Sequence, residues 1–260
     1  MNDITAAFHE YFEIVNASTP ELLIVVFELR YQILCIRENI PGFEADKYPD
    51  GVERDKYDDC SIHLLLRHRA SNSFIGTARL ILSDSRGENK KFPVELHTQF
   101  YPTYSNMYVN RQHTIEISRF AILSDFFRRK DDVNFAVSRT SGQSTVNRRR
   151  RFPHPMLALA VGVIQMCARQ GIYYWFSAMD PALNRLLGFY GMQLNPIGPL
   201  TDFHGARRPY HVCVLDVLER MHQNHYDIWE LVSDNGKVWP ADLTSLRNYL
   251  QDPADATVAL

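Results

Sequence analysis

The feature that most constrains the fold is the stretch HTIEISRFAIL at residues 113–123. Its length and apolar content are typical of a buried β-strand, yet it contains Glu116 and Arg119. A buried charge without a partner costs several kcal/mol, so a fold that buries this strand must bring opposite charges to it. The sequence therefore predicts a sheet that carries a buried ionic cluster.

A second charge is predicted on the apolar side of a helix. Residues 18–38, STPELLIVVFELRYQILCIRE, begin with Thr19 as a plausible N-cap and Pro20 at the first helical position. When successive residues are placed about 100° apart around the helix, Arg30 falls among the apolar side chains. We therefore expect Arg30 to point toward the core and to need a carboxylate.

Candidate carboxylates precede the first predicted strand. Glu53, Asp55 and Asp58 lie within six residues, and Arg79 follows in the strand-like run GTARLIL. With Glu116, these acids are the available partners for the three arginines. Their joint occurrence favours one ionic network over scattered salt bridges.

Strand alternation makes a specific prediction about Arg119. Side chains two residues apart point to the same face of a strand. Arg119 is therefore expected on the same face as Ile117 and Ala121.

The order of elements predicts an α/β (α+β) fold in which helices flank a mixed sheet. The pattern indicates a β-hairpin, a third antiparallel strand, a helix, a strand, a helix, a strand pair and a C-terminal helix. These elements cover residues 61–69, 74–83, 113–123, 155–170, 172–179, 180–191, 192–198, 209–217 and 217–233. We expect residues 1–260 to form one domain, with a core at about 18–235 and a helical tail at 236–260.

Composition excludes several classes of protein. The formal net charge of -2 argues against a nucleic-acid-binding protein, because phosphate neutralisation needs an excess of Lys and Arg. The four cysteines are far apart in the sequence, so they suggest neither a disulfide framework nor a metal site, and a cytoplasmic setting fits best. The N-terminus does not have the pattern of a signal peptide, and the apolar runs are too short for a transmembrane segment.

The ionic residues occur in an order that resembles a known family. Arg30, then the acidic pattern at 53–58, then Arg79 in a strand, then EISRF at 116–120 is similar to the signature of the LuxI-type acyl-homoserine-lactone synthases. The resemblance implies a GNAT-like acyl-CoA N-acyltransferase fold with a mixed, twisted β-sheet. It also implies a set of substrate-binding residues: Arg30, Glu53, Asp55, Asp58, Arg79, Arg119 and Phe120.

Later segments resemble a narrower group, the PEP-CTERM/exosortase system-associated acyltransferases, which are related to N-acyl amino acid synthases. These segments are KYPDGVERDKYD, EISRFAIL, MDPALNRLLGFYGMQLNPIGPLTDFHGARRPY and DIWELVSDNG, and the resemblance covers roughly residues 20–236. It implies transfer of a fatty acyl group onto the α-amine of an amino acid. The donor would be a thioester of acyl-carrier protein or of coenzyme A, and no tightly bound cofactor is implied.

Two alternatives stay open. One is an acyl-homoserine-lactone synthase that uses S-adenosylmethionine. That family has aromatic residues four and ten positions after the helix arginine, where this chain has Leu34 and Ile40. The other alternative is a non-catalytic acyl-binding module with the same fold.

Glu116 is the candidate catalytic base, with Ser118 as a possible hydrogen-bond partner on the same strand face. Aminolysis of a thioester needs a neutral amine, and a free α-amino group titrates near pH ~8. A carboxylate that takes the proton typically accelerates such a step by about 10²- to 10⁴-fold. The competing interpretation is that Glu116 only pairs with a neighbouring arginine.

Two further regions have expected roles in binding. Six arginines of a polar stretch, predicted to be a long loop at 124–152, would attract an acidic carrier protein: Arg128, Arg129, Arg148, Arg149, Arg150 and Arg151. The helix at 155–170 and the strand at 172–179 are the candidate walls of an apolar acyl groove.

Overall fold

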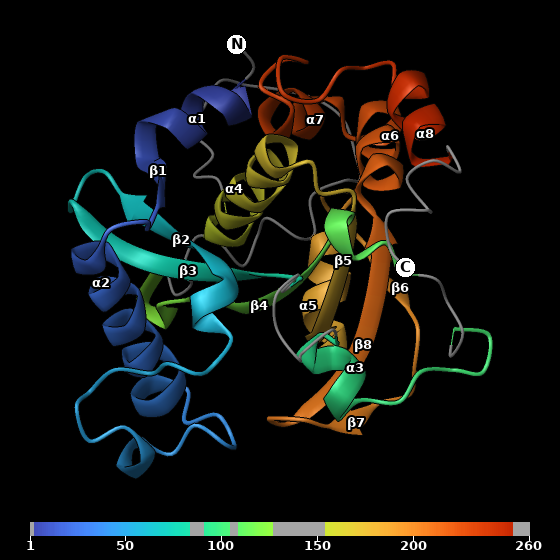
Figure 1. Ribbon diagram of the computed structural model, residues 1–260. Helices are drawn as coiled ribbons and strands as arrows, with labels where there is room; N and C mark the ends of the chain where they lie inside the picture. Colours follow the sequence, from blue (N-terminus) through green and yellow to red (C-terminus); the bar gives the residue numbers. More distant parts are fainter. Residues whose placement is uncertain (1–2, 84–90, 105–108, 127–153, 252–260) are drawn as a thin grey trace, which may run out of the picture.

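The computed structural model describes residues 3–83, 91–104, 109–126 and 154–251, and a single sheet runs through them (Figure 1). Its strands are ordered β1-β2-β3-β4-β5-β8-β6, and β7 pairs with β8. The strands are β1 Phe12–Asn16, β2 Ser61–His68, β3 Ser73–Leu82, β4 Thr114–Ile122, β5 Tyr174–Met179, β6 Asn195–Pro196, β7 Thr201–Asp202 and β8 Ala206–Cys213. The α-helices are α1 Asp3–Tyr11, α2 Pro20–Arg30, α3 Pro93–His97, α4 Pro155–Gln170, α5 Pro181–Gly188, α6 Val214–Asn224, α7 Tyr226–Val232 and α8 Thr244–Gln251.

Strand pairing divides the sheet into two halves. Strands β1 to β4 are antiparallel neighbours, and β8 is antiparallel to β5. Between the halves, β4 and β5 run parallel and pair only from Thr114–Tyr174 to Glu116–Phe176. Beyond Glu116 the two strands no longer pair with each other, so the sheet opens at its centre.

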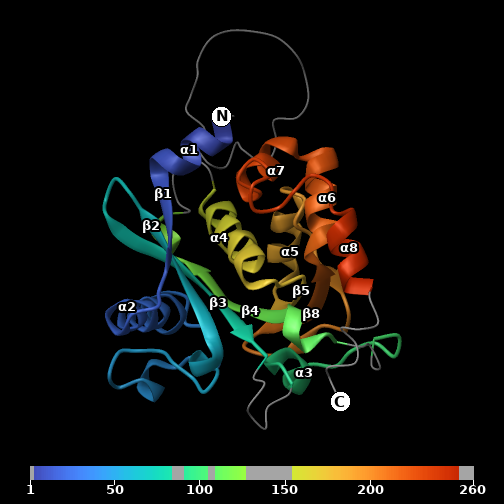
Figure 2. The same cartoon turned by 45° about the horizontal axis from the view of Figure 1, so that its top comes forward.

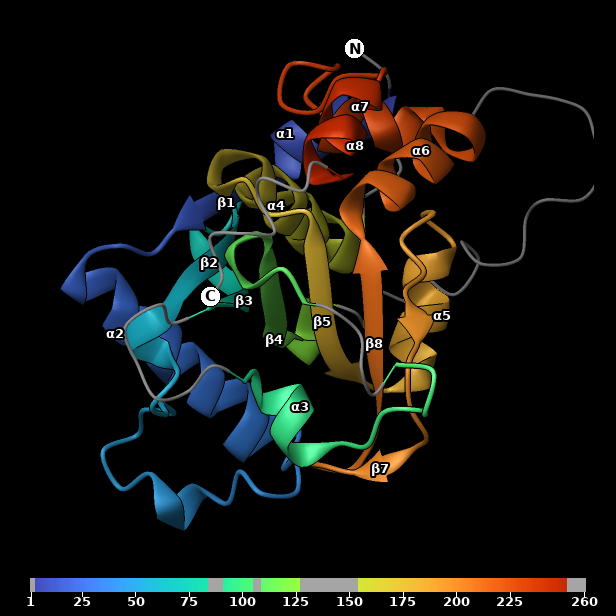
Figure 3. The same ribbon diagram turned by 45° about the vertical axis from the view of Figure 1, so that its right-hand side comes forward.

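Helices cover both faces of the first half, with α4 on one face and α2 on the other (Figures 1 and 2). Strand β2 shows how alternation supplies both cores: Leu64 and Leu66 pack in the cluster that contains α4, and Leu65 packs in the cluster that contains α2. All three leucines are fully buried. The second half has α3 and β7 near the lower ends of β5 and β8 in Figure 3.

The helix starts predicted from the sequence are confirmed. The Thr19 side chain accepts a hydrogen bond from the backbone N–H of Leu22, and α2 begins at Pro20. Asp180 caps α5 in the same way, accepting from Ala182 at 2.6 Å. Helix α2 continues past Arg30 as a wider π-helical segment, Tyr31–Arg37.

Strand β4 contains a bulge at the charged stretch. Ser118 lies opposite Arg79 and Ala121 opposite Thr77, so two residues of β4 face the single residue between them on β3. Arg119 has φ of +51°, which is uncommon for a residue with a side chain.

The bulge makes the predicted face of Arg119 wrong for Ile117 only, since Arg119 does share a face with Ala121. Ile117 packs with the α4 cluster, whereas Ala121 packs with the α2 cluster. Because the extra residue interrupts the alternation, Ser118 and Arg119 both make contacts on the α2 face.

Other predicted elements are confirmed with changed bounds. The hairpin, the third strand, the helix at 155–170 and the strand after it are all present. The predicted C-terminal helix is divided into α6 and α7 at His225, and the predicted strand at 192–198 keeps only the two residues of β6. Helix α8 lies in the predicted C-terminal tail.

The N-terminal elements were not anticipated. Helix α1 and strand β1 precede the expected start of the core, and β1 forms an edge of the sheet by pairing with β2. In the part of the chain that the structure describes, none of the helices has the length and hydropathy needed to span a membrane.

Candidate active site

A buried ionic network joins α2, the segment before β2, and strands β3 and β4. Glu53 is its central carboxylate: Arg30 donates to Glu53 Oε2 at 2.5 Å, and Arg119 donates to both Glu53 oxygens at 2.9 and 3.0 Å. Arg30 and Glu53 are both fully buried. The predicted orientation of Arg30 toward the core is therefore confirmed.

Two aspartates complete the network. Arg79 donates to Asp55 at 2.6 Å and to Asp58 at 2.8 Å. Asp58 also accepts from Arg30 at 2.7 Å, and Asp55 accepts from Arg119 at 2.9 Å. Three guanidinium groups thus meet three carboxylates, and their charges balance.

The arginines of the network keep Glu53 and Asp58 ionised. Burial would raise the pKa of Glu53, but the charges of Arg119 and Arg30 outweigh burial and hold that pKa at about 2. The same opposition acts on Asp58, where Arg30 and Arg79 lower the pKa despite burial. Glu53 and Asp58 therefore stay ionised through the neutral pH range.

Glu116 lies outside this network, which corrects the expectation that it pairs with the arginines. Its Oε2 accepts a hydrogen bond at 2.8 Å from the backbone N–H of Val94, in the first turn of α3. No arginine of the described chain lies within ion-pair distance of Glu116. Because its side chain is only 3 % exposed, burial raises the pKa of Glu116 to about 7.

Ser118 is bonded to the network and not to Glu116. Its hydroxyl oxygen accepts from Arg79 Nε at 2.9 Å. Because the oxygen accepts this bond, the hydroxyl hydrogen remains available to donate elsewhere. Ser118 therefore offers a donor beside the positive charge of Arg79.

A cavity of about 780 Å³ lies where β4 and β5 separate. Ser177 Oγ donates to the carbonyl oxygen of Ile117 at 3.1 Å at the point where the pairing ends. Several charged and polar residues line the cavity, among them Asp55, Arg79, Glu116, Ser118, Arg119 and Arg207. Apolar residues of α4, α5 and the segment after α5 also line it: Met156, Ala160, Val163, Leu183, Leu187, Met192 and Leu194.

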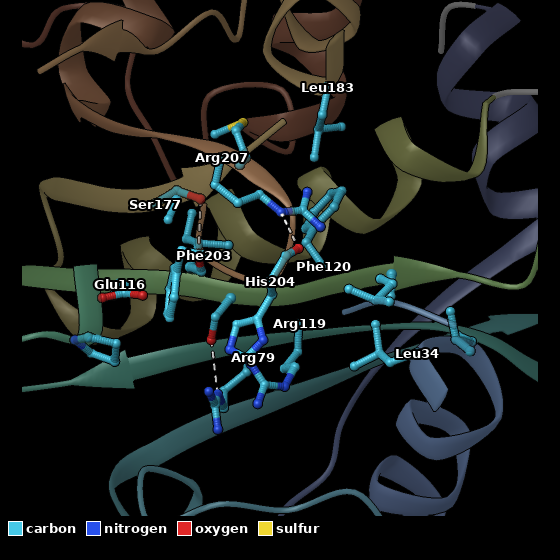
Figure 4. A pocket seen from close by; sticks show the side chains of 18 of the residues that line it. Leu34, Arg79, Glu116, Arg119, Phe120, Ser177, Leu183, Phe203, His204 and Arg207 are labelled. Atoms are coloured by element: carbon cyan, nitrogen blue, oxygen red, sulfur yellow. Dashed lines mark hydrogen bonds between the residues drawn. The ribbon is translucent and has the colours of Figure 1, made fainter. Parts of the chain in front are cut away.

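The close-up shows lining residues on both sides of β4. In Figure 4, Arg79 and Arg119 lie on one side of the β4 ribbon, and Arg207 and Leu183 lie on the other. Trp175, Ala178 and Met179 of β5 also line the cavity. The predicted acyl groove, formed by the helix at 155–170 and the strand at 172–179, thus coincides with apolar walls of the cavity.

The predicted site residues divide into two groups. Asp55, Arg79, Glu116, Ser118, Arg119 and Phe120 line the cavity, whereas Arg30, Glu53 and Asp58 are not among the lining residues. The second group supports the first through ion pairs. The arginines predicted to dock a carrier protein, Arg128, Arg129 and Arg148 to Arg151, lie outside the described residues.

The sequence did not reveal the part of the site formed by the β7–β8 hairpin. Phe203, His204 and Arg207 all line the cavity. His204 Nδ1 lies 3.0 Å from the carbonyl oxygen of Pro41, and a Cβ on Gly42 would lie 2.2 Å from the same nitrogen. The hairpin is thus fitted closely against the loop after α2, and the turn sequence FHG was the only signal for it.

Comparisons with known proteins support this architecture. Residues 29–136 match the family model of the acetyltransferase (GNAT) domain. No curated protein sequence matches the chain.

Several solved structures are similar over most of the chain. TofI, solved in a ternary complex with an inhibitor and MTA, has a TM-score of 0.54 and 16% identity, with 82% of this chain and 96% of TofI covered. BjaI, a CoA-dependent acyl-homoserine lactone synthase solved with SAM and isopentyl-CoA, has a TM-score of 0.54 and 18% identity, with 89% and 90% covered. MesI, another CoA-dependent acyl-homoserine lactone synthase, has a TM-score of 0.51 and 14% identity, with 83% and 95% covered.

At these identities the similarity establishes the fold. The chain has the GNAT fold, a mixed sheet that is mostly antiparallel and flanked by helices. The sequence-based prediction of the fold is therefore confirmed.

Proposed function

We propose that the protein is an N-acyltransferase that moves a fatty acyl group from a thioester to the α-amine of an amino acid. The observation that carries the proposal is the single cavity in which Glu116 and the unpaired edge of β4 share one space with apolar walls. A base, a polar strand edge and an apolar pocket are the three surroundings that acyl transfer to an amine requires.

Glu116 is suited to take the proton of the amine. Its Oε2 is fixed by the N–H of Val94, while its other oxygen accepts no hydrogen bond from the described residues. With a pKa of about 7, Glu116 is partly ionised at neutral pH and titrates close to the amine it would deprotonate. Because no arginine of the described chain forms an ion pair with Glu116, its carboxyl group is not held in the ionised form.

The reaction forms a C–N bond and breaks a C–S bond. The neutral amine attacks the carbonyl carbon of the thioester, its proton passes to Glu116, and the thiolate leaves and takes up a proton. The negative charge on the carbonyl oxygen would be met by backbone N–H groups of β4 beyond Glu116, where β5 no longer pairs. Ser118, with its free hydroxyl hydrogen, is a candidate donor to the thiolate.

The acyl chain would occupy the apolar part of the cavity. Met156, Ala160 and Val163 of α4 form one wall. These side chains offer only dispersion contacts and exclude water, which suits an alkyl chain and no charged group.

The donor is proposed to be acyl-carrier protein, with coenzyme A as the alternative carrier. The arginine-rich stretch supports this choice by its charge, since Arg128, Arg129 and Arg148 to Arg151 would attract an acidic partner. The likeness to PEP-CTERM/exosortase system-associated acyltransferases supports an amino acid as the acceptor.

The second candidate is synthesis of acyl-homoserine lactones. The assembly of Arg30, Arg79 and Arg119 with their three acids favours it, because the order of these residues resembles that family. Against it, Leu34 and Ile40 line the cavity where the family pattern has aromatic residues.

Product analysis tests the proposal and separates the candidates. A lipid extract of a bacterium that expresses the protein is expected to gain N-acyl amino acids in mass spectrometry. The purified protein should form the same products from acyl-carrier-protein or coenzyme A thioesters with free amino acids. Products that require S-adenosylmethionine would establish the second candidate, and binding of donor without any product would establish a non-catalytic acyl-binding module.

A further inference from the structure

Arg207 is the arginine of the cavity whose charge no carboxylate balances. Its Nε donates to the carbonyl oxygen of His204 at 3.3 Å, and no acid of the described chain lies within ion-pair distance of it. Figure 4 shows the side chain reaching toward the middle of the pocket, where it meets His204. A guanidinium that is partly buried and lacks a counter-ion favours the binding of an anion there.

The other arginines of the cavity are poorer anion sites. Arg79 and Arg119 already share Asp55, and each has a second carboxylate, from Asp58 and Glu53 respectively. Because the three acids already balance the three arginines, the network has no net positive charge to attract a further carboxylate. Arg207 forms no ion pair with any carboxylate of the described chain, although Glu38 and Asp202 also line the cavity.

The proposed reaction brings one anionic group close to the reacting amine. A thioester and the pantetheine arm next to it carry no charge, whereas an amino acid carries its α-carboxylate on the same carbon as its α-amine. Glu116 and Arg207 line the same cavity. Glu116 can accept a proton from the α-amine, and the positive charge of Arg207 can bind the α-carboxylate.

We propose that Arg207 binds the α-carboxylate of the acceptor and so restricts acyl transfer to amino acids with a free carboxylate. The inference rests on the proposed function and adds to it the group that the acceptor must carry. The hairpin that holds Arg207 is itself fixed by the contact of His204 with Pro41, so the guanidinium has a defined place. Arg207 is a binding residue in this scheme and takes no proton.

The test compares amino acids with their carboxamides as acceptors. The twenty L-amino acids are first assayed with a fatty acyl thioester, and each one that is acylated is compared with its carboxamide. Wild-type protein is expected to prefer the free acid by about tenfold to a hundredfold in kcat/KM, the value of a hydrogen-bonded charge pair. Arg207→Gln should remove this preference by raising KM for the acid, and Arg207→Lys should restore part of it.

Arg208→Gln is the matched control. Arg208 is the next residue of β8, does not line the cavity, and should on substitution leave the preference unchanged. The KM for the thioester donor is measured in all variants.

The outcomes separate this inference from the proposed function. Equal use of acid and carboxamide by wild-type protein, or an unchanged acid KM in Arg207→Gln, would refute the carboxylate site and leave acyl transfer established. An increase in donor KM alone would assign Arg207 to a phosphate of the donor and also refute it. Absence of transfer to every amino acid would refute the proposed function and this inference together.

Discussion

Glu53, which bonds to Arg119 of β4, and Glu116, which belongs to β4, are two buried glutamates that differ in what surrounds them. Glu53 is fully buried and meets Arg30 and Arg119, which hold its pKa at about 2. Glu116 is 3 % exposed and meets one backbone N–H, and burial raises its pKa to about 7. Equal burial thus gives opposite shifts, because the partners decide which protonation state is favoured.

The difference suits Glu53 to a structural role and Glu116 to a role in proton transfer. A carboxylate that is always ionised and fully paired holds segments together. A carboxyl group that titrates near neutrality, with one oxygen unbonded, can exchange a proton. Substitutions of Glu116 and of the residues of the ionic network test this comparison.

The largest effect is expected from Glu116→Gln. The amide can still accept the Val94 N–H but cannot take a proton, so the rate of acyl transfer should fall about 10²- to 10⁴-fold. Donor binding should persist, as measured by titration calorimetry with the thioester. Glu28→Gln, on the exposed side of α2, is the control and should change the rate less than about twofold, as surface substitutions generally do. Unchanged turnover in Glu116→Gln would remove Glu116 from the mechanism.

The next effect is expected from Arg30→Met, which keeps the volume but leaves Glu53 and Asp58 short of a positive charge. The free energy of unfolding should fall by about 3–5 kcal/mol, the usual result of removing one partner of a buried ion pair. Denaturant titration measures it. The control Arg37→Met removes an exposed pair with Asp125 and should cost at most about 1 kcal/mol. A loss in Arg30→Met no larger than in this control would contradict the structural role of the network.

The smallest effect is a contrast in how stability depends on pH. Glu53 has a lowered pKa in the folded state, so its contribution is present above about pH 4.5 and is lost as the pH falls toward about 2. Glu116 has a raised pKa, so the folded state binds the extra proton between pH 4.5 and about 7, and its contribution is lost as the pH rises through that range.

Unfolding free energies measured from pH 3 to pH 8 test both signs. Relative to wild type, Glu116→Gln should become more stable as the pH rises from about 4.5 to 7, by a few kcal/mol at most. In wild type, protonation of Glu53 lowers the free energy of unfolding as the pH falls below about 4.5. In Glu53→Gln this part of the pH dependence should be absent. Parallel curves for wild type and Glu116→Gln would show that the folded state does not raise this pKa.

Local patterns account for the parts of the molecule that the sequence predicted. The caps at Thr19 and Asp180 act within a few residues, and the β2–β3 hairpin joins two strands that follow each other in the sequence. The position of Arg30 followed from the helical period alone, because an apolar face dictates which side chains turn inward.

Long-range contacts account for what the sequence did not predict. Glu53 is 23 residues from Arg30 and 66 from Arg119, so composition could suggest a network but not which acid meets which arginine. The sequence pattern gave no sign that Arg207 lies in the site. Its position depends on a hairpin that packs against a loop far away in the sequence.

The sequence by itself determined the order of the elements, the residue types of the ionic network and the presence of charges in β4. Tertiary structure alone decided the bulge at Arg119, the separation of β4 from β5, the cavity between them and the isolation of Glu116 from the arginines. The physical reason is that periodicity and capping are set by neighbours in the chain. Pairing, burial and pKa depend on which distant groups share one desolvated space.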